Sequence, residues 1–216
     1  MKKLNMRRMS YLVALVLIGA VTPGLAIERS GENRESDEPS GPAYSINNIK
    51  STLSWEGSKP GGGHFGTIEV INGAAHADGG VISGGSFEID MSSIRNEDIK
   101  KEDMRDKLVG HLKSEDFFYV EKYPKATFKI TKVEAGSGAT QTITGDLTIR
   151  GNTNEISFPA EVSVDDNMIH ASTEKITLDR TLWEVNHMSK SVFAEIKDRF
   201  IDDEMVVKLD LHFNRN

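Results

Sequence analysis

The sequence predicts an all-β protein, an extended eight-stranded antiparallel β-barrel with one main α-helix. Three observations predict this class. Apolar and polar residues alternate in several short segments, as in strands that bury one face. Turns rich in glycine and polar residues separate these segments, and a single stretch has apolar residues at helical spacing. Because strands do not alternate regularly with helices, a parallel βαβ fold is disfavoured.

Six groups of residues are each expected to share one face of a strand. From the N-terminus they are Ile49, Ser51, Leu53 and Trp55; Gly66, Ile68 and Val70; Val81, Gly85, Phe87 and Ile89; Ala126, Phe128 and Ile130; Ile143, Leu147 and Ile149; and Ile156, Phe158, Ala160 and Val162. Two further groups complete the count: Ile169, Ala171 and Thr173, leading into Ile176 and Leu178, and then Met205, Val207, Leu209, Leu211 and Phe213. Gly84 and Gly85 predict a bulge or bend, and Pro159 predicts an edge or bulge position.

The helix is predicted over residues 96–112. Met104, Leu108, Val109 and Leu112 recur at helical spacing and form one apolar stripe. Asp98 lies near the start of this stretch, where the helix dipole favours negative charge. We therefore expect one amphipathic helix to lie across a mouth or wall of the barrel.

Residues 1–26 have the features of a secretory signal peptide. Lys2, Lys3, Arg7 and Arg8 precede the apolar run 11–21, and small residues close the segment. The apolar run is shorter than the ~20 residues that span a bilayer, so no stable membrane span is expected after cleavage. An uncleaved anchor is the weaker alternative. These features predict a periplasmic or secreted protein.

Residues 27–42 are polar and charged, which predicts a flexible linker before a single domain over residues 43–216. The whole chain has a net charge of −7, from 26 basic and 33 acidic residues. Removing the four basic residues of the signal peptide leaves 22 basic against 33 acidic residues, or −11. Such a balance argues against nucleic acid as a partner.

No catalytic motif is recognisable, and the chain contains no cysteine, so thiol catalysis and thiolate metal sites are excluded. His64, His111 and His187 lie at the edges of predicted elements and could converge as zinc ligands. Separate, hydrogen-bonded histidines are the favoured alternative. We therefore predict no catalytic residue, no metal site and no cofactor.

Two polar or aromatic groups leave alternatives open. Arg180 could bind a phosphate or carboxylate head group, but an ion pair with Asp179 or Glu184 is favoured. The aromatic residues Phe117, Phe118, Tyr119 and Tyr123 could form a ligand gate. An aromatic corner that packs the helix onto the barrel is favoured.

Several short motifs, in this order, resemble the YceI-like family. They are residues 51–57 (STLSWEG), 59–66 (KPGGGHFG), 85–90 (GSFEID), 111–118 (HLKSEDFF) with Tyr123-Pro124, 145–151 (GDLTIRG) and 179–183 (DRTLW). The resemblance covers nearly all of residues 43–213. The opening motif and the HFG triplet look most like the branch of the family common in Bacteroidetes-type bacteria.

The resemblance implies a lipocalin-like barrel whose apolar tunnel holds a polyisoprenoid or quinone-like lipid, in an exported carrier or storage protein. By motif position, the candidates for the tunnel lining are Trp55, Phe65, Phe87, Ile89, Phe128, Ile130, Leu147, Ile149 and Phe158. The candidates for its mouth are His64, His111 and Arg180. The resemblance also suggests a homodimer. The alternatives are an envelope stress or structural protein with a closed barrel and no lipid cargo, and an enzyme with a histidine-metal site.

Overall fold

A computed structural model describes residues 38–193, 195 and 199–216. The predicted signal peptide, and the predicted linker up to residue 37, lie outside the described residues. The described elements, in chain order, are β1 (Ala43–Ile46), β2 (Thr52–Lys59), β3 (Gly62–Asp78), β4 (Val81–Asn96), α1 (Glu102–Lys113), β5 (Lys125–Ala135), β6 (Thr140–Ile149), β7 (Asn152–Val164), β8 (Met168–Ser172), β9 (Ile176–Asp179), the 3-10 helix η1 (Arg180–Trp183) and β10 (Glu204–Arg215).

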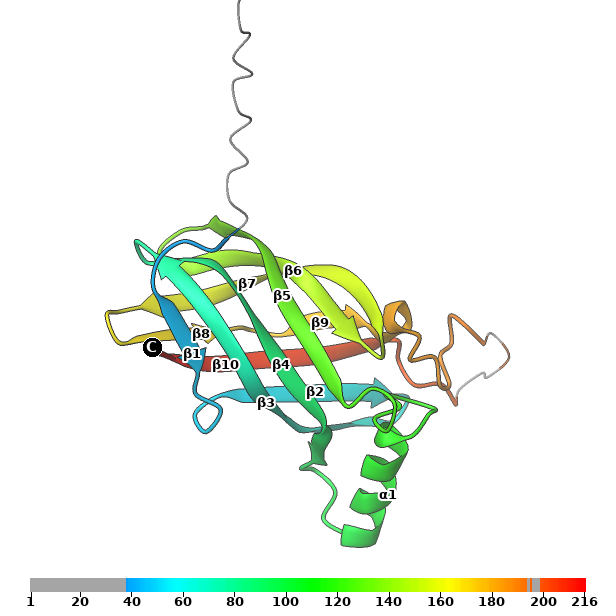
Figure 1. Cartoon of the computed structure of the whole chain (residues 1–216). Helices are drawn as coiled ribbons and strands as arrows, with labels where there is room; N and C mark the ends of the chain where they lie inside the picture. Colours follow the sequence, from blue (N-terminus) through cyan, green and yellow to red (C-terminus); the bar gives the residue numbers. More distant parts are fainter. Residues whose placement is uncertain (1–37, 194, 196–198) are drawn as a thin grey trace, which may run out of the picture. The chain divides into compact units, whose positions relative to one another are not determined.

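The strands form one antiparallel sheet that closes into a ring of eight strands, as predicted. Following β2, each strand up to β8 pairs with the next along the chain, and β10 pairs with both β2 and β8 (Figure 1). Closure satisfies the backbone groups that an open sheet would leave at its edges. The fold is therefore an all-β, lipocalin-like barrel with one main helix.

The strands β1 and β9 lengthen the ring rather than widen it. Along one side of β10, β2 pairs with residues 205–210 and β1 with residues 213–215. Along the other side, β9 pairs with residues 204–207 and β8 with residues 210–214. Two short strands thus take the place of one long strand on each side of β10, and the ring stays eight strands around.

One part of the wall lacks strand pairing on one side. Strand β7 pairs with β8 only over Glu161–Val164. Residues 152–158 pair with β6 along one edge, and no described strand pairs with their other edge. Helix η1 lies there instead, because Asn154 Nδ2 donates to the Leu182 carbonyl at 2.8 Å and Asn152 Nδ2 to the Trp183 carbonyl at 3.3 Å. Pro159 lies just beyond this seam, where its missing N–H leaves no ladder bond unmade.

Two predicted inward positions are wrong. Ile49 is 94% exposed, because it lies in the turn between β1 and β2 rather than in a strand. At the start of β4, Ile82 is buried instead of Val81. The register against β3 shifts between Ile82 and Gly84, and beyond this shift Gly85, Phe87 and Ile89 lie on the inward face as predicted. A bulge adds one residue to one strand of a pair. Alternation counted across the bulge therefore assigns the residues before it to the wrong face.

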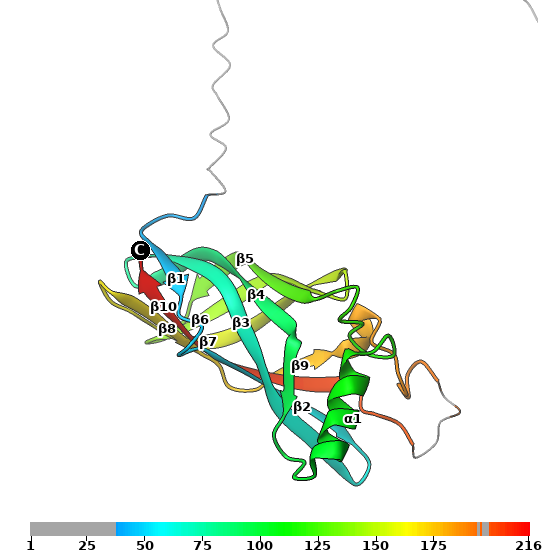
Figure 2. The same ribbon diagram turned by 60° about the horizontal axis from the view of Figure 1, so that its bottom comes forward.

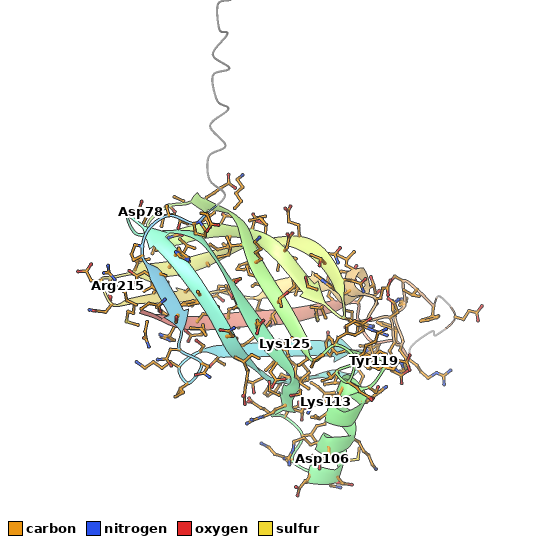
Figure 3. The ribbon with its side chains drawn as sticks, in the orientation of Figure 1. Asp78, Asp106, Lys113, Tyr119, Lys125 and Arg215 are labelled. Atoms are coloured by element: carbon orange, nitrogen blue, oxygen red, sulfur yellow. The ribbon has the colours of Figure 1, made fainter. Side chains whose placement is uncertain are left out.

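The barrel interior is packed at one end. There Tyr44, Ala75, Ile82, Ile169, Leu211 and Phe213 are all buried, near the short strand β1. Asp78 and Arg215 lie at this end in Figure 3, whereas Tyr119 and Lys113 lie at the other. Helix α1 stands beside the β2–β3 hairpin at that second end (Figure 2).

Helix α1 is shorter than predicted. It begins at Glu102, because β4 continues through Asn96. Leu112 is buried, and Leu108 and Val109 pack against the core, but Met104 is 49% exposed. The apolar stripe therefore contacts the barrel only along its C-terminal part.

The last residues of the predicted linker contact the barrel. Ser83 Oγ donates to the Ser40 carbonyl at 2.5 Å, and Ala77 N–H donates to the Pro42 carbonyl at 3.4 Å. Among the described residues, no helix has the length and apolar character needed to cross a membrane.

Candidate functional site: an apolar cavity under the helix

A cavity of about 180 Å³ lies in the barrel, and Leu108 and Leu112 of α1 contribute to its lining. Strands, α1 and the segment after η1 all contribute to its lining. Its apolar lining residues are Leu53, Trp55, Ile68, Phe87, Ile89, Met91, Ile94, Leu108, Leu112, Phe117, Phe118, Ala126, Phe128, Leu147, Ile149, Ile156, Phe158, Ile176, Leu178, Val185, Ile201, Met205, Val207 and Leu209. Such a surface favours an apolar occupant over water.

Three phenylalanines form an aromatic row along the cavity wall. The ring centroids of Phe87 and Phe128 are 5.4 Å apart, and those of Phe128 and Phe158 are 5.7 Å apart. Gly145 makes room for the middle ring, since a Cβ at this position would lie 2.5 Å from Cζ of Phe128. The first glycine of residues 145–151 is therefore a packing requirement of the cavity wall.

The polar lining residues come from one end of the barrel. They are Glu56, Ser58, Lys59, His64, Arg180, Asp202 and Glu204. Backbone bonds hold their segments together, as in the bond from Asp202 N–H to the Ser58 carbonyl at 2.9 Å. The cavity thus combines an apolar body with a polar mouth, which is the arrangement that fits an amphiphile.

His64 is fixed in this mouth by Asp98. Its Nδ1 lies 2.9 Å from Asp98 Oδ2, while Asp98 Oδ1 accepts a bond from the Phe65 N–H at 3.0 Å. Burial is the largest single influence on the pKa of Asp98 and raises it. Hydrogen bonds from His64, Phe65 N–H and Asn96 together outweigh burial, so the pKa of Asp98 lies below its ordinary value.

Arg180 is buried, with 4% of its surface exposed, and is held by the protein itself. Its guanidinium donates to the carbonyls of Val185, Asp202 and Ile201, the last two at 3.0 Å. Its Nη2 also lies 3.5 Å from Asp203 Oδ1. Burial lowers the pKa of Arg180, against the opposing effect of Asp203 and its acidic neighbours.

Arg180 thus forms an ion pair within the protein, but its partner is Asp203 rather than the expected Asp179 or Glu184. The Asp179 carboxylate instead caps η1, because its Oδ1 accepts bonds from the Thr181 N–H at 2.9 Å and the Thr181 hydroxyl at 2.6 Å. Arg180 nevertheless lines the cavity mouth.

Trp183, at the end of η1, is fully buried. Its indole N–H donates to the Leu147 carbonyl at 2.9 Å, which joins η1 to β6. Residues 179–183 and 145–151, two motifs of the family resemblance, therefore meet in the wall beside the cavity.

Nine of the twelve candidates line the cavity: Trp55, Phe87, Ile89, Phe128, Leu147, Ile149, Phe158, His64 and Arg180. Phe65 differs from the expectation, because it alternates with the inward His64 and Gly66 and is 51% exposed on the outer wall. Ile130 lies opposite Gly145 on the inward face of β5 and is half-buried against the core, but it does not line the cavity. His111 also lies outside the lining and pairs with Asp116.

Several lining residues were not among the candidates. Strand β10 supplies Met205, Val207 and Leu209, whose clean alternation in the sequence was a usable signal. Helix α1 supplies Leu108 and Leu112 from its apolar stripe. Phe117 and Phe118 also line the cavity, so the aromatic corner both packs the helix onto the barrel and closes the cavity.

An eight-stranded antiparallel barrel with an apolar cavity and a polar mouth defines the class of lipocalin-like proteins. Comparison with known proteins gives the family. The YceI-like domain matches residues 44–213, nearly the whole described domain. The chain therefore belongs to the YceI-like family, as its motifs predicted. Its assignment to a Bacteroidetes-type branch stays a prediction.

Curated relatives match over a shorter region. A UPF0312 protein of Photorhabdus laumondii is 45% identical over 52 residues, which make up 24% of this chain and 27% of that protein. A UPF0312 protein of Vibrio parahaemolyticus is 46% identical over 51 residues, which make up 27% of its length. These matches thus span about a quarter of the relatives' length.

Solved structures share the fold at low sequence identity. BcnA of Burkholderia cenocepacia superposes with a TM-score of 0.60 at 19% identity, over 77% of this chain and 98% of BcnA. A polyisoprenoid binding domain from Saccharophagus degradans superposes with a TM-score of 0.57 at 16% identity, over 81% of this chain and 99% of that domain. At this level of sequence identity, the likeness shows a shared barrel fold alone.

Proposed function

We propose that the protein binds one amphiphilic lipid, a polyisoprenoid or quinone-like molecule, as an exported carrier or storage protein. The observation that carries this proposal is the apolar cavity, whose polar groups gather at a single mouth. The proposed role is binding rather than catalysis. The Saccharophagus degradans domain, described as polyisoprenoid binding, supports the same ligand class.

The energetics of such binding come mainly from the apolar chain. Each methylene moved from water into the cavity contributes ~0.8 kcal/mol, so a chain gains affinity with few polar contacts. An engineered apolar cavity of about 150 Å³ holds one benzene molecule, and this cavity measures about 180 Å³. A long chain must therefore displace lining side chains or extend through the mouth, where Lys59 and His64 could contact its head group.

Native mass spectrometry of the protein isolated from its own organism's envelope tests the proposal. A stoichiometric polyprenyl or quinone adduct, identified in the solvent extract, is the expected result. A clean protein mass that persists after incubation with such lipids would overturn it. That outcome would favour the alternative, an envelope stress or structural protein whose barrel has no lipid cargo.

Two matched variants locate the binding site. Ala126 is buried and lines the cavity, whereas its neighbour Thr127 points to the outer wall. Ala126→Phe should fill the cavity and reduce uptake of a polyprenyl probe at least tenfold, while Thr127→Phe should leave uptake unchanged. Equal uptake by both variants, each with the wild-type circular dichroism spectrum, would place the ligand elsewhere.

A further inference from the structure

Three side chains that can bind metals meet beside the cavity. His111 comes from α1, Asp116 from the turn that follows it, and His187 from the segment after η1. His111 Nε2 lies 3.2 Å from Asp116 Oδ2, and the ring centroids of His111 and His187 are 4.7 Å apart. One ligand atom from each residue lies within 4.8 Å of the others.

These distances are close to those of a coordination sphere. Two metal bonds of 2.0–2.1 Å at a tetrahedral angle place their ligand atoms about 3.3 Å apart. The separation of His111 Nε2 from Asp116 Oδ2, 3.2 Å, already matches that edge. The ligand atom of His187 lies within 4.8 Å of both of these atoms.

The orientation of the rings also suits a shared ion. A metal lies near the plane of each imidazole that binds it, through the in-plane lone pair of a ring nitrogen. The planes of His111 and His187 meet at 84°, so the two rings are not stacked and their planes intersect, as binding of one shared ion requires.

A second cluster with the same residue types lacks this property. His170, Asp210 and His212 lie together on the barrel wall, with His170 Nε2 at 2.7 Å from Asp210 Oδ1. The two rings are stacked, with centroids 4.4 Å apart and an interplanar angle of 15°. Nearly parallel planes at this separation share no point within bonding distance, so this cluster is the less suitable site.

The surroundings hold the first cluster in place. The ring centroid of Phe117 lies 4.9 Å from that of His111, in an edge-on arrangement, and 5.2 Å from that of His187. Arg150 Nη1 donates to the Phe117 carbonyl and the Glu184 carbonyl, both at 2.9 Å, and so joins the two segments that carry the ligands.

We propose that His111, Asp116 and His187 form a site for a divalent transition metal ion such as Zn²⁺. Two imidazoles and one carboxylate match the preferences of these ions and leave coordination positions open. The sequence had suggested His64 as a third histidine of such a site, but His64 pairs with Asp98 in the cavity mouth. The ion would join α1 to the segment after η1, both of which line the cavity.

Isothermal titration of the chelator-treated full chain with Zn²⁺ tests this site independently of any lipid. His187→Phe keeps the aromatic packing and should weaken Zn²⁺ binding more than about 100-fold, above the range for residues that only orient ligands. Asp116→Asn, on an exposed side chain, should weaken it about tenfold or more. His170→Phe, in the second cluster, should leave the affinity unchanged.

A second readout separates coordination from a change in folding. Co²⁺ bound in place of Zn²⁺ should give the visible absorption of a low-symmetry site, and His187→Phe should abolish it while the circular dichroism spectrum stays that of the wild type. Zn²⁺ affinity equal to the wild type in both His187→Phe and Asp116→Asn would overturn the proposal. Loss of binding in His170→Phe alone would overturn it as well and assign the ion to the second cluster.

Discussion

The guanidinium of Arg150 donates to the backbone carbonyl of Phe117 at 2.9 Å, which fixes the turn after β6 against the aromatic corner after α1. The same nitrogen donates to the Glu184 carbonyl, also at 2.9 Å. Arg150 adopts a left-handed conformation, with φ of 52°, just before Gly151. Three segments around the cavity thus meet at one side chain that belongs to neither the lining nor the core.

The first prediction concerns Arg150. Arg150→Ala should lower the free energy of unfolding by about 2 kcal/mol, because it removes two hydrogen bonds from a charged donor. Arg150→Lys keeps the charge but not the planar fork, so it should recover only part of that loss. Urea unfolding measures both values. A loss below about 0.5 kcal/mol in Arg150→Ala would show that the segments hold together without it.

The second prediction concerns the ion pair of the buried Arg180 with the partly buried Asp203. Arg180→Met should cost about 3–5 kcal/mol, because it leaves Asp203 and three backbone carbonyls without their partner. Adding Asp203→Asn to this variant should cost less than the two single changes summed, since they share one interaction. Lys208→Met, on the exposed face of β10, is the surface control. Additive costs would argue against the pairing.

The third prediction compares neighbouring residues of β6. Leu147 is buried and lines the cavity, whereas Thr148 points outward and pairs with Thr153 Oγ1 at 2.7 Å. Leu147→Asp should abolish folding or ligand uptake, because it buries an unpaired charge at a cost of several kcal/mol. Thr148→Asp should keep both. Thermal unfolding and lipid uptake check the pair, and a stable, lipid-binding Leu147→Asp protein would contradict the inward face of β6.

The fourth prediction concerns acid stability and Asp98. Since the pKa of Asp98 is lowered on folding from an ordinary value of 3.8, its ionised form stabilises the fold above that value. This contribution is lost as the pH falls through the folded pKa. Asp98→Asn should therefore reduce stability at pH 7 by about 1 kcal/mol and flatten the loss of stability on acidification.

A matched control for this pH dependence is Asp106→Asn on the exposed face of α1 (Figure 3). Its acid unfolding curve should follow that of the wild type. If Asp98→Asn and the wild type lose stability in parallel between about pH 5 and pH 2, Asp98 is not the group that titrates.

Much of the fold follows from local patterns. The period of two in β6, β7 and β10 identifies their inward faces, because neighbouring side chains of a strand point to opposite sides. Where a strand bends, the pattern fails. The register of β4 shifts between Ile82 and Gly84, so local alternation misplaced Val81, whereas Ile130 keeps its inward face because the bulge of β5 follows it.

The sequence by itself determined the class of fold, the family and the inward faces of several strands, because alternation and motif order are local properties of the chain. The tertiary structure alone decided which distant side chains meet. It placed Asp203 beside Arg180, Asp98 beside His64 and His187 beside His111. Pairing of β3 with β4 brings His64 to Asp98, and pairing of β9 with β10 brings Arg180 to Asp203. Helix α1 and the segment after η1 bring His111 to His187.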